Sequence, residues 1–202
     1  MKVVLRKCCI SQVQVGAIIS SANVNLAGNA LPNYWRHMGR KNVDGVVHKL
    51  GGSKLKLALS KCKVPLEMGD VAVTAQHSTR LATDHIFHCV CPDYLYGVHD
   101  QLDLEDKYSR MVGAILLAAD SKNISSIAVP ALGCGVKGWP AAKAAKLSLD
   151  TLQHFRGVAL SSVTFALLDA NVYNVWTTVC KKYHGAPDQD GNTECCWNDI
   201  QT

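Results

Sequence analysis

Several features that mark common protein classes are missing from this sequence of 202 residues. No C-x-x-C pair occurs among its nine cysteines, whereas zinc sites usually show two such pairs or a Cys/His equivalent. The longest apolar runs, such as 113–119, fall far short of the ~20 residues that a membrane-spanning helix needs. Lys2 and Arg6 interrupt the first apolar residues, which is not typical of a signal peptide. We therefore expect no metal, no membrane partner, and a cytoplasmic or nuclear protein.

Aromatic residues and charge of one sign are also scarce. Aromatic residues make up 6% of the chain, charged residues 18%, and the formal net charge is +5. This mild excess favours anionic ligands, but it lacks the basic or aromatic stripe of nucleic-acid binders, so nucleic acid is not an expected partner. The odd number of cysteines and the lack of a secretory signal predict reduced thiols that fill the core as small apolar groups.

What the sequence does contain is an alternation of strand-like and helix-like segments. Apolar runs of strand length lie at 3–5, 16–20, 71–73, 86–90, 127–129 and 163–168. Segments with helical spacing or helix-end signals lie at 102–120, 140–154 and 171–183. Near-continuous apolar strands separated by helices predict a mostly parallel sheet that is covered on both faces. We expect one α/β domain over residues 1–185 and a polar C-terminal tail over 186–202.

Two of the predicted strands run into polar or glycine-rich turns. Asn23 follows the strand at 16–20, and the strand at 127–129 leads into a glycine loop, 133–138. The carboxyl ends of parallel strands share one sheet edge, where α/β proteins bind ligands. Exposed backbone amides of a glycine loop can bind phosphate. The loop has no Walker or Rossmann pattern, and a lone asparagine usually stabilises its own turn.

Two aspartates lie at the expected starts of helices. Asp44 stands where a loop at 42–52 enters a short helix, and His48 follows one helical turn later. Such an aspartate is most often a cap or a dipole partner, but if it faces the cleft it could orient or deprotonate a water molecule. Asp169 follows the last predicted strand, where capping of the next helix is the expected role.

Taken together, five motifs resemble the macrodomain, an ADP-ribose-binding module, over residues 3–184. They are Ser21-Ala22-Asn23, Val43-Asp44-Gly45-Val46-Val47-His48, Gly69-Asp70-Val71-Ala72-Val73-Thr74, Ile86-Phe87-His88-Cys89-Val90 and Pro130-Ala131-Leu132-Gly133-Cys134-Gly135-Val136. The second motif resembles that of MacroD-type ADP-ribosyl hydrolases. The resemblance implies a three-layer α/β/α fold with ADP-ribose across the strand ends and no cofactor.

The resemblance also implies roles for particular residues. Asn23 would contact the distal ribose, and together with Asp44 it would place a water molecule for attack at the anomeric carbon. Such a centre needs positioning and a nearby anion more than a strong nucleophile. The implied ligand-binding residues are Cys9, Ile10, Asn23, Gly45, Val46, Gly133, Cys134, Gly135, Val136, Lys137, Leu168, Asp169 and Asn171.

The sequence departs from the family pattern in several places. Cys9 stands where the family usually has an adenine-binding acidic residue, and a thiol is a poor acceptor. Lys137 replaces an aromatic residue beside the distal ribose and could pair with a phosphate, and Leu168 replaces a frequent aromatic. The stretch 24–42 is longer than usual, and 31–37 within it could form a lid.

Three functions follow from these observations. The first is hydrolysis of mono-ADP-ribose from modified proteins by Asn23 and Asp44. The second is a non-catalytic reader of ADP-ribose, in which the pocket survives but the water is not positioned. The third is an interaction protein with a macrodomain shape and impaired ligand binding. The motif around Asp44 favours the first, whereas Cys9, Lys137 and the insertion favour the others, so enzymatic activity is left open.

Overall fold

The computed structural model describes residues 1–28, 42–75, 81–95, 100–183, 185–187 and 193–196. Eight strands form one sheet in the order β3-β4-β2-β5-β6-β1-β8-β7. Their bounds are β1 Lys2–Arg6, β2 Ala17–Ser21, β3 Val71–Ala75, β4 His85–Cys89, β5 Ser126–Pro130, β6 Ser162–Ala166, β7 Gly185–Pro187 and β8 Thr193–Cys196. The helices are α2 Val43–Leu59, α3 Gln101–Ser121, α4 Ala141–His154 and α5 Ala170–Cys180, with two short 3-10 turns, η1 Ile10–Gln12 and η2 Lys181–Tyr183.

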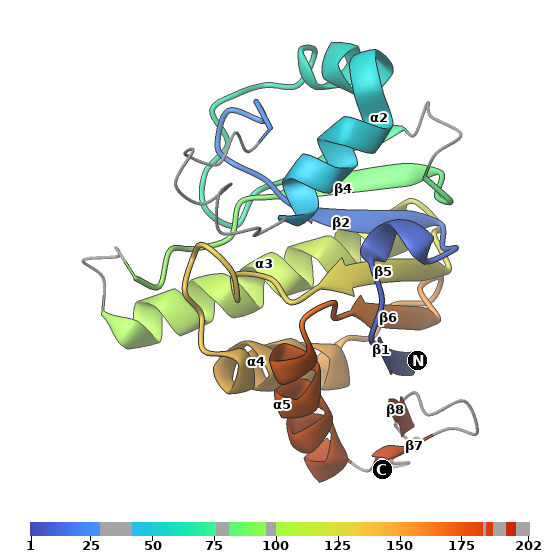
Figure 1. The fold of residues 1–202 in the computed structure, drawn as a ribbon, viewed down its shortest axis with the longest axis vertical. Helices are drawn as coiled ribbons and strands as arrows, with labels where there is room; N and C mark the ends of the chain where they lie inside the picture. Colours follow the sequence, from blue (N-terminus) through green and yellow to red (C-terminus); the bar gives the residue numbers. More distant parts are fainter. Residues whose placement is uncertain (29–41, 76–80, 96–99, 184, 188–192, 197–202) are drawn as a thin grey trace.

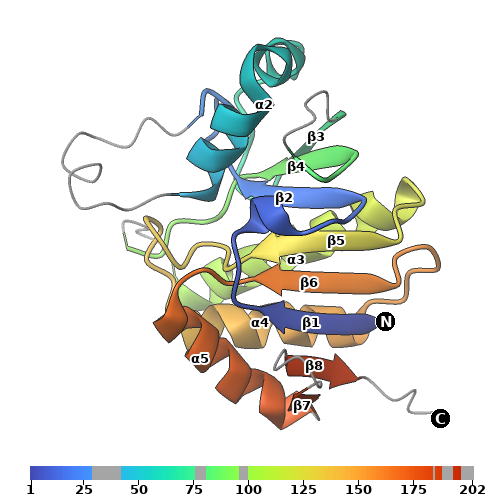
Figure 2. The same cartoon turned by 45° about the vertical axis from the view of Figure 1, so that its right-hand side comes forward.

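The five central strands, from β4 to β1, are parallel, while β3, β8 and β7 pair antiparallel at the two sides. Burial explains this arrangement, because β4, β5 and β6 each bury four successive residues and need cover on both faces. Figure 2 shows the arrowheads of β5, β6 and β1 pointing to one side of the sheet. The mostly parallel central sheet predicted from the sequence is confirmed.

Helices cover both faces of the sheet, which gives the expected three-layer α/β/α architecture (Figure 1). On one face, α3, α4 and α5 bury their apolar stripes against side chains such as Ile19, Phe87 and Phe165. On the other face, α2 and η1 pack on Ile18 and Ile86. Alternate residues of a strand point to opposite faces, so neighbours on β2 belong to different core clusters.

Helix α2 has two parts. The short helix that the sequence predicts after residue 42 is the first part, and α2 as a whole spans 17 residues. Gly52 breaks the helical geometry within it, with φ 59° and ψ −150°, but the chain resumes as helix on the far side. Leu55 and Leu59 are buried beyond the kink, so packing against the sheet stabilises the second half.

The described part of the C-terminal segment pairs with the sheet. Strand β8 pairs antiparallel with β1, and β7 pairs with β8, so sheet pairing continues past residue 185. Residues 188–192 and 197–202 lie outside the described residues, and the division of the chain at 185 stays a prediction. The expectation of reduced thiols is met by six free cysteines, but Cys180 at the end of α5 is disulfide-bonded, which corrects it there.

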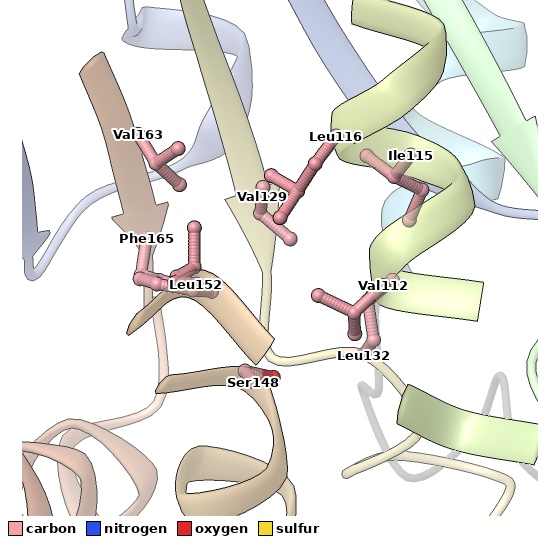
Figure 3. Close-up of a pocket in the computed structure, with 9 residues that line it drawn as sticks. All are labelled: Val112, Ile115, Leu116, Val129, Leu132, Ser148, Leu152, Val163 and Phe165. Carbon is pink, nitrogen blue, oxygen red and sulfur yellow. The ribbon is translucent and has the colours of Figure 1, made fainter. Parts of the chain in front are cut away.

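A small internal cavity lies between the sheet and the helices α3 and α4 (Figure 3). Its volume is about 10 Å³, and Ser148 is the one polar residue among the nine that line it. Such a volume is about the least that holds a single water molecule. The cavity is therefore a minor packing gap that cannot admit a nucleotide, and the candidate site lies elsewhere, at the strand ends. In the described part of the chain, no helix is both long and apolar enough to cross a membrane.

Candidate functional site

The residues that the sequence analysis selected follow the carboxyl ends of the parallel strands. Asn23 comes two residues after β2, the glycine loop 133–138 follows β5, and Asp169 comes three residues after β6. Helices α2 and α5 begin beside this edge, so their amino ends, which carry partial positive charge, lie near it (Figure 2). The fold therefore collects the predicted phosphate loop and the predicted polar side chains at one edge.

Asp44 is fully buried in the first turn of α2. The cap of this helix is Asn42, whose side chain accepts a hydrogen bond from the Gly45 amide at 2.6 Å, so Asp44 is not needed as a cap. Instead, Asp44 Oδ1 accepts a hydrogen bond of 2.9 Å from the hydroxyl of Ser20 on β2. His48 lies one turn further along α2, with its Nε2 3.6 Å from the same oxygen. The Asp44 carboxylate is thus held in a fixed orientation.

Asn23 organises the turn that follows β2. Its side-chain oxygen accepts hydrogen bonds from the Asn25 and Ala27 amides at 3.1 and 3.2 Å, and its amide group donates to the Gly28 carbonyl at 3.2 Å. Gly28 in turn lies against the His48 ring, since a Cβ added there would be 3.0 Å from Nδ1. The structure therefore brings the Asn23 turn and the start of α2 together through His48. The proposed lid, 31–37, lies outside the described residues.

A second histidine, which unlike His48 is buried, extends the polar cluster across the sheet. His88 on β4 pairs in register with Ser20 on β2, and its Nε2 lies 2.9 Å from the Thr74 hydroxyl on β3. Both His88 and Thr74 are buried. Burial, and to a smaller extent the nearby His48, lower the pKa of His88 to about 4. His88 is therefore neutral at physiological pH, with one ring nitrogen engaged by Thr74.

The low pKa of His88 predicts a loss of stability in acid. In the unfolded chain the His88 side chain is protonated near pH 6.5, whereas in the folded chain it is protonated only near pH 4. The free energy of unfolding is therefore highest above pH 6.5 and decreases as the pH falls below it. The expected loss between these values is about 3 kcal/mol. Urea unfolding at pH 7 and pH 4.5 measures it, with His88→Gln retaining the Thr74 contact but not the titration. If His88→Gln loses as much unfolding free energy between pH 7 and pH 4.5 as the wild type, His88 is not the cause of the loss. The control is His154→Gln, which replaces an exposed histidine.

The glycine loop after β5 has two kinds of glycine. Gly133 has φ +73° and packs tightly, since an added Cβ would lie 2.4 Å from Trp139 Cδ1, whereas a Cβ at Gly135 would meet nothing within 4 Å. The Cys134 amide donates to the Ala131 carbonyl at 3.1 Å, so the turn itself already uses that amide. Within the described residues, neither the Gly135 nor the Val136 amide donates a hydrogen bond. The Gly133 and Lys137 amides also donate no hydrogen bond there, so four backbone amides of the loop are available to an anion.

The side chains of this loop are less suited to chemistry. Burial raises the pKa of the Cys134 thiol to about 12, so the thiol stays protonated at neutral pH and is not a nucleophile. Lys137 Nζ forms an ion pair of 3.0 Å with Asp93, which lies in the segment after β4. The Tyr94 amide donates to the Lys137 carbonyl at 2.9 Å, and this bond also ties the two segments together. Lys137 is thus beside the loop, with its charge balanced by Asp93.

The remaining ligand-binding residues implied by the resemblance follow β1 and β6 and lie mainly in turns. Cys9 precedes η1, and its thiol contacts the Ser11 hydroxyl at 3.1 Å, while Ile10 is buried in the core with 3% of its surface exposed. Asp169 caps α5 by accepting from the Val172 amide at 2.9 Å, as its expected capping role requires. In addition, Leu168 is 61% exposed and Asn171 is exposed at the same helix start.

Gly45 and Val46 have their amides engaged within the start of α2, by the side chain and the carbonyl of Asn42 respectively.

Three polar residues of the site region were not selected from the sequence: Ser20, His88 and Asp93. Ser20 and His88 lie inside apolar strands, where a single polar residue is an available signal, but only the strand register shows that they are neighbours. No group of three potential metal-binding side chains occurs in the part of the chain that the structure describes.

Comparison with known proteins places these features in a family. A family model described as Macro domain matches residues 20–148. An O-acetyl-ADP-ribose deacetylase of Salmonella gallinarum is 30% identical over 152 residues, which is 72% of this chain and 74% of the relative. O-acetyl-ADP-ribose deacetylase 1 of Pantoea vagans is 25% identical over 180 residues, covering 85% of this chain and 97% of the relative.

Solved structures agree on the fold. An Oceanobacillus iheyensis macrodomain mutant with ADPR superposes with a TM-score of 0.75 at 22% identity, covering 89% of this chain and 92% of the other. The macrodomain of the same organism with ADP gives a TM-score of 0.74 at 24% identity, with 89% of each chain covered. The matched range of the family model covers most of the chain, and these structures share its fold. The chain belongs to the Macro domain family.

Proposed function

We propose that this protein binds ADP-ribose at the strand-end edge and hydrolyses mono-ADP-ribose from modified proteins. The diphosphate would contact the Gly135 and Val136 amides, and the distal ribose would lie near Asn23. Water would attack the anomeric carbon while the bond to the protein side chain breaks. Asp44 would accept a proton from the water, and the released side-chain oxygen or nitrogen would take up a proton. Bond formation and bond cleavage are then balanced without a cofactor.

The observation that carries this proposal is the fixed carboxylate of Asp44. It is fully buried, its Oδ1 accepts a hydrogen bond of 2.9 Å from the Ser20 hydroxyl, and the same oxygen lies 3.6 Å from His48 Nε2. A carboxylate held in one orientation beside a predicted ribose site has the character of a general base rather than of a surface charge. The capping role that would otherwise explain an aspartate at a helix start belongs to Asn42.

A second function, that of a non-catalytic reader, is favoured by the state of Asn23. Its three side-chain hydrogen bonds within the described residues all lie in its own turn, and they occupy both lone pairs of the oxygen and one of the two amide hydrogens. A ribose hydroxyl can therefore only accept from the remaining amide hydrogen. If the turn holds that hydrogen away from the ligand, ADP-ribose can still bind through the glycine loop, but the water near Asp44 lacks one of its two positioning groups. The name of the Salmonella relative indicates a second substrate, O-acetyl-ADP-ribose, whose ester linkage would also be cleaved by an activated water.

Two measurements separate these functions. Free ADP-ribose is expected to raise the melting temperature, because a ligand that binds only the native state stabilises it. Release of ADP-ribose from a mono-ADP-ribosylated protein, and of acetate from O-acetyl-ADP-ribose, then tests catalysis. A thermal shift without either release identifies a reader. No shift at millimolar ADP-ribose would contradict both the hydrolase and the reader.

A further inference from the structure

The lysines of α2 and of the turn after it give the molecule its most uneven charge distribution. Between residues 49 and 63 the chain has five lysines and no acidic residue, and all five are exposed: Lys49, Lys54, Lys56, Lys61 and Lys63. The whole sequence has 21 basic and 16 acidic residues, so this segment alone accounts for the net charge of +5. We name these five residues the α2 lysine surface. The charge is therefore concentrated, although the composition suggested a mild and dispersed excess.

On the opposite face of the sheet, four basic residues of α3 and α4 form ion pairs with acidic residues. On α3, Lys107 pairs with Asp103 and Arg110 with Asp106, and on α4, Lys143 pairs with Glu105 and Lys146 with Asp150. None of the five lysines of the α2 lysine surface forms an ion pair with an acidic residue in the described ranges. Figure 1 shows α2 at one end of the molecule, well separated from α4 and α5. Folding alone would favour balanced charges on this segment as well, because an excess of one sign repels itself.

The position of α2 relative to the candidate site suggests a role for its lysines in binding a substrate protein. The helix begins at the candidate site, with Asp44 in its first turn, and the lysines start at Lys49 and continue away from the site. A protein that carries ADP-ribose would leave the pocket at the distal ribose, near Asn23 and Asp44. Its chain would then pass the amino end of α2. We propose that the α2 lysine surface docks an acidic segment of the modified protein, an inference that rests on the proposed function.

The chemistry of the surface favours carboxylates over nucleic acid. Residues 42–68 contain no arginine and no aromatic residue. Nucleic-acid sites commonly use the bidentate contacts of arginine and the stacking of bases on aromatic rings. Lysines are compact hydrated charges on flexible stems, which attract an acidic segment without demanding one geometry. A membrane surface would need an apolar helix face, but α2 buries Val47, Leu55 and Leu59 on the sheet side and exposes a single large apolar side chain, Leu57, within the described residues.

The test uses the full chain and two mono-ADP-ribosylated peptides that differ only in having glutamate or glutamine beside the modified residue. The variant Lys54→Gln/Lys56→Gln/Lys61→Gln is compared with Lys107→Gln/Arg110→Gln/Lys146→Gln, which removes the same charge from the other face. We expect the α2 variant to raise KM for the glutamate peptide about five- to tenfold at low salt, with kcat unchanged. The glutamine peptide and the control variant should show no change, and added salt should abolish the difference.

Equal KM values for the two peptides in both the wild type and the α2 variant would overturn the proposal. Loss of binding to a 20-base-pair DNA duplex in the α2 variant, without the peptide effect, would also overturn it in favour of nucleic acid. Failure of the proposed function is visible separately, as no binding of free ADP-ribose by the wild type. In that case, fluorescence anisotropy with an unmodified glutamate-rich peptide tests the surface alone. Equal affinity of the wild type and the α2 variant for that peptide would overturn the docking role.

Discussion

Replacing Asp44 by asparagine is expected to lower the rate of ADP-ribose release by about 10²- to 10⁴-fold, the usual contribution of a general base. Asparagine has nearly the same shape and still offers an oxygen to the Ser20 hydroxyl, which now donates to Asp44 at 2.9 Å. It cannot accept a proton from water. Single-turnover release from a mono-ADP-ribosylated protein measures the effect, and the Kd of free ADP-ribose should change little, because binding rests on the glycine loop.

Asp120→Asn is the matched control for Asp44→Asn. The Asp120 carboxylate accepts hydrogen bonds from the Ala159 and Leu160 amides at 2.7 and 2.9 Å, at the opposite end of β6 from the strand-end edge. These bonds hold the pKa of Asp120 below its usual range. The control variant should lose stability but keep its release rate. If Asp44→Asn releases ADP-ribose as fast as the wild type, Asp44 is not the base. If neither protein releases ADP-ribose although both bind it, the reader function holds.

The fold could be predicted from the sequence because its strands are short apolar runs with clear boundaries. Ile127-Ala128-Val129, for example, lies inside β5, and the helical spacing at 102–120 agrees with α3 to within one residue at each end. The short helix expected after residue 42 is the first part of α2, and the helical geometry breaks at Gly52. The second part was not predicted, and burial of Leu55 and Leu59 stabilises it.

The candidate site could be predicted only in part. The position of Asn23 after a strand and of Asp44 at a helix start needs no long-range information. The Ser20–Asp44 hydrogen bond cannot be predicted in this way, because it depends on how α2 packs over β2, and the sequence between these two elements has no clear pattern. The pairing of β8 with β1 also depends on tertiary contact, since Thr193–Cys196 is a brief strand in a polar segment. Local patterns therefore identify chemistry, whereas register and packing decide which groups meet.

Replacing Gly135 by valine is expected to weaken ADP-ribose binding at least tenfold, or about 1.4 kcal/mol, while leaving the fold intact. A Cβ at Gly135 meets no atom within 4 Å, so the side chain has room in the free protein. The same space is where a phosphate must approach the Gly135 and Val136 amides, and a branched side chain there blocks the backbone. Isothermal titration with ADP-ribose gives the loss in affinity, and thermal unfolding without ligand reports the fold.

Gly133→Ala is the contrasting variant in the same loop, because it should damage the fold rather than the ligand contact. Its Cβ would lie 2.4 Å from Trp139 Cδ1 and 2.9 Å from Cys91 Sγ, at a backbone φ of +73°. We expect a loss of about 3 kcal/mol in unfolding free energy from overpacking and backbone strain together. A loss of stability in Gly133→Ala and a loss of affinity in Gly135→Val would show that Gly133 maintains the shape of the loop and that Gly135 lies where the phosphate binds. If Gly135→Val binds ADP-ribose like the wild type, the loop does not hold the diphosphate, and the amino ends of α2 and α5 become the next candidates for that role.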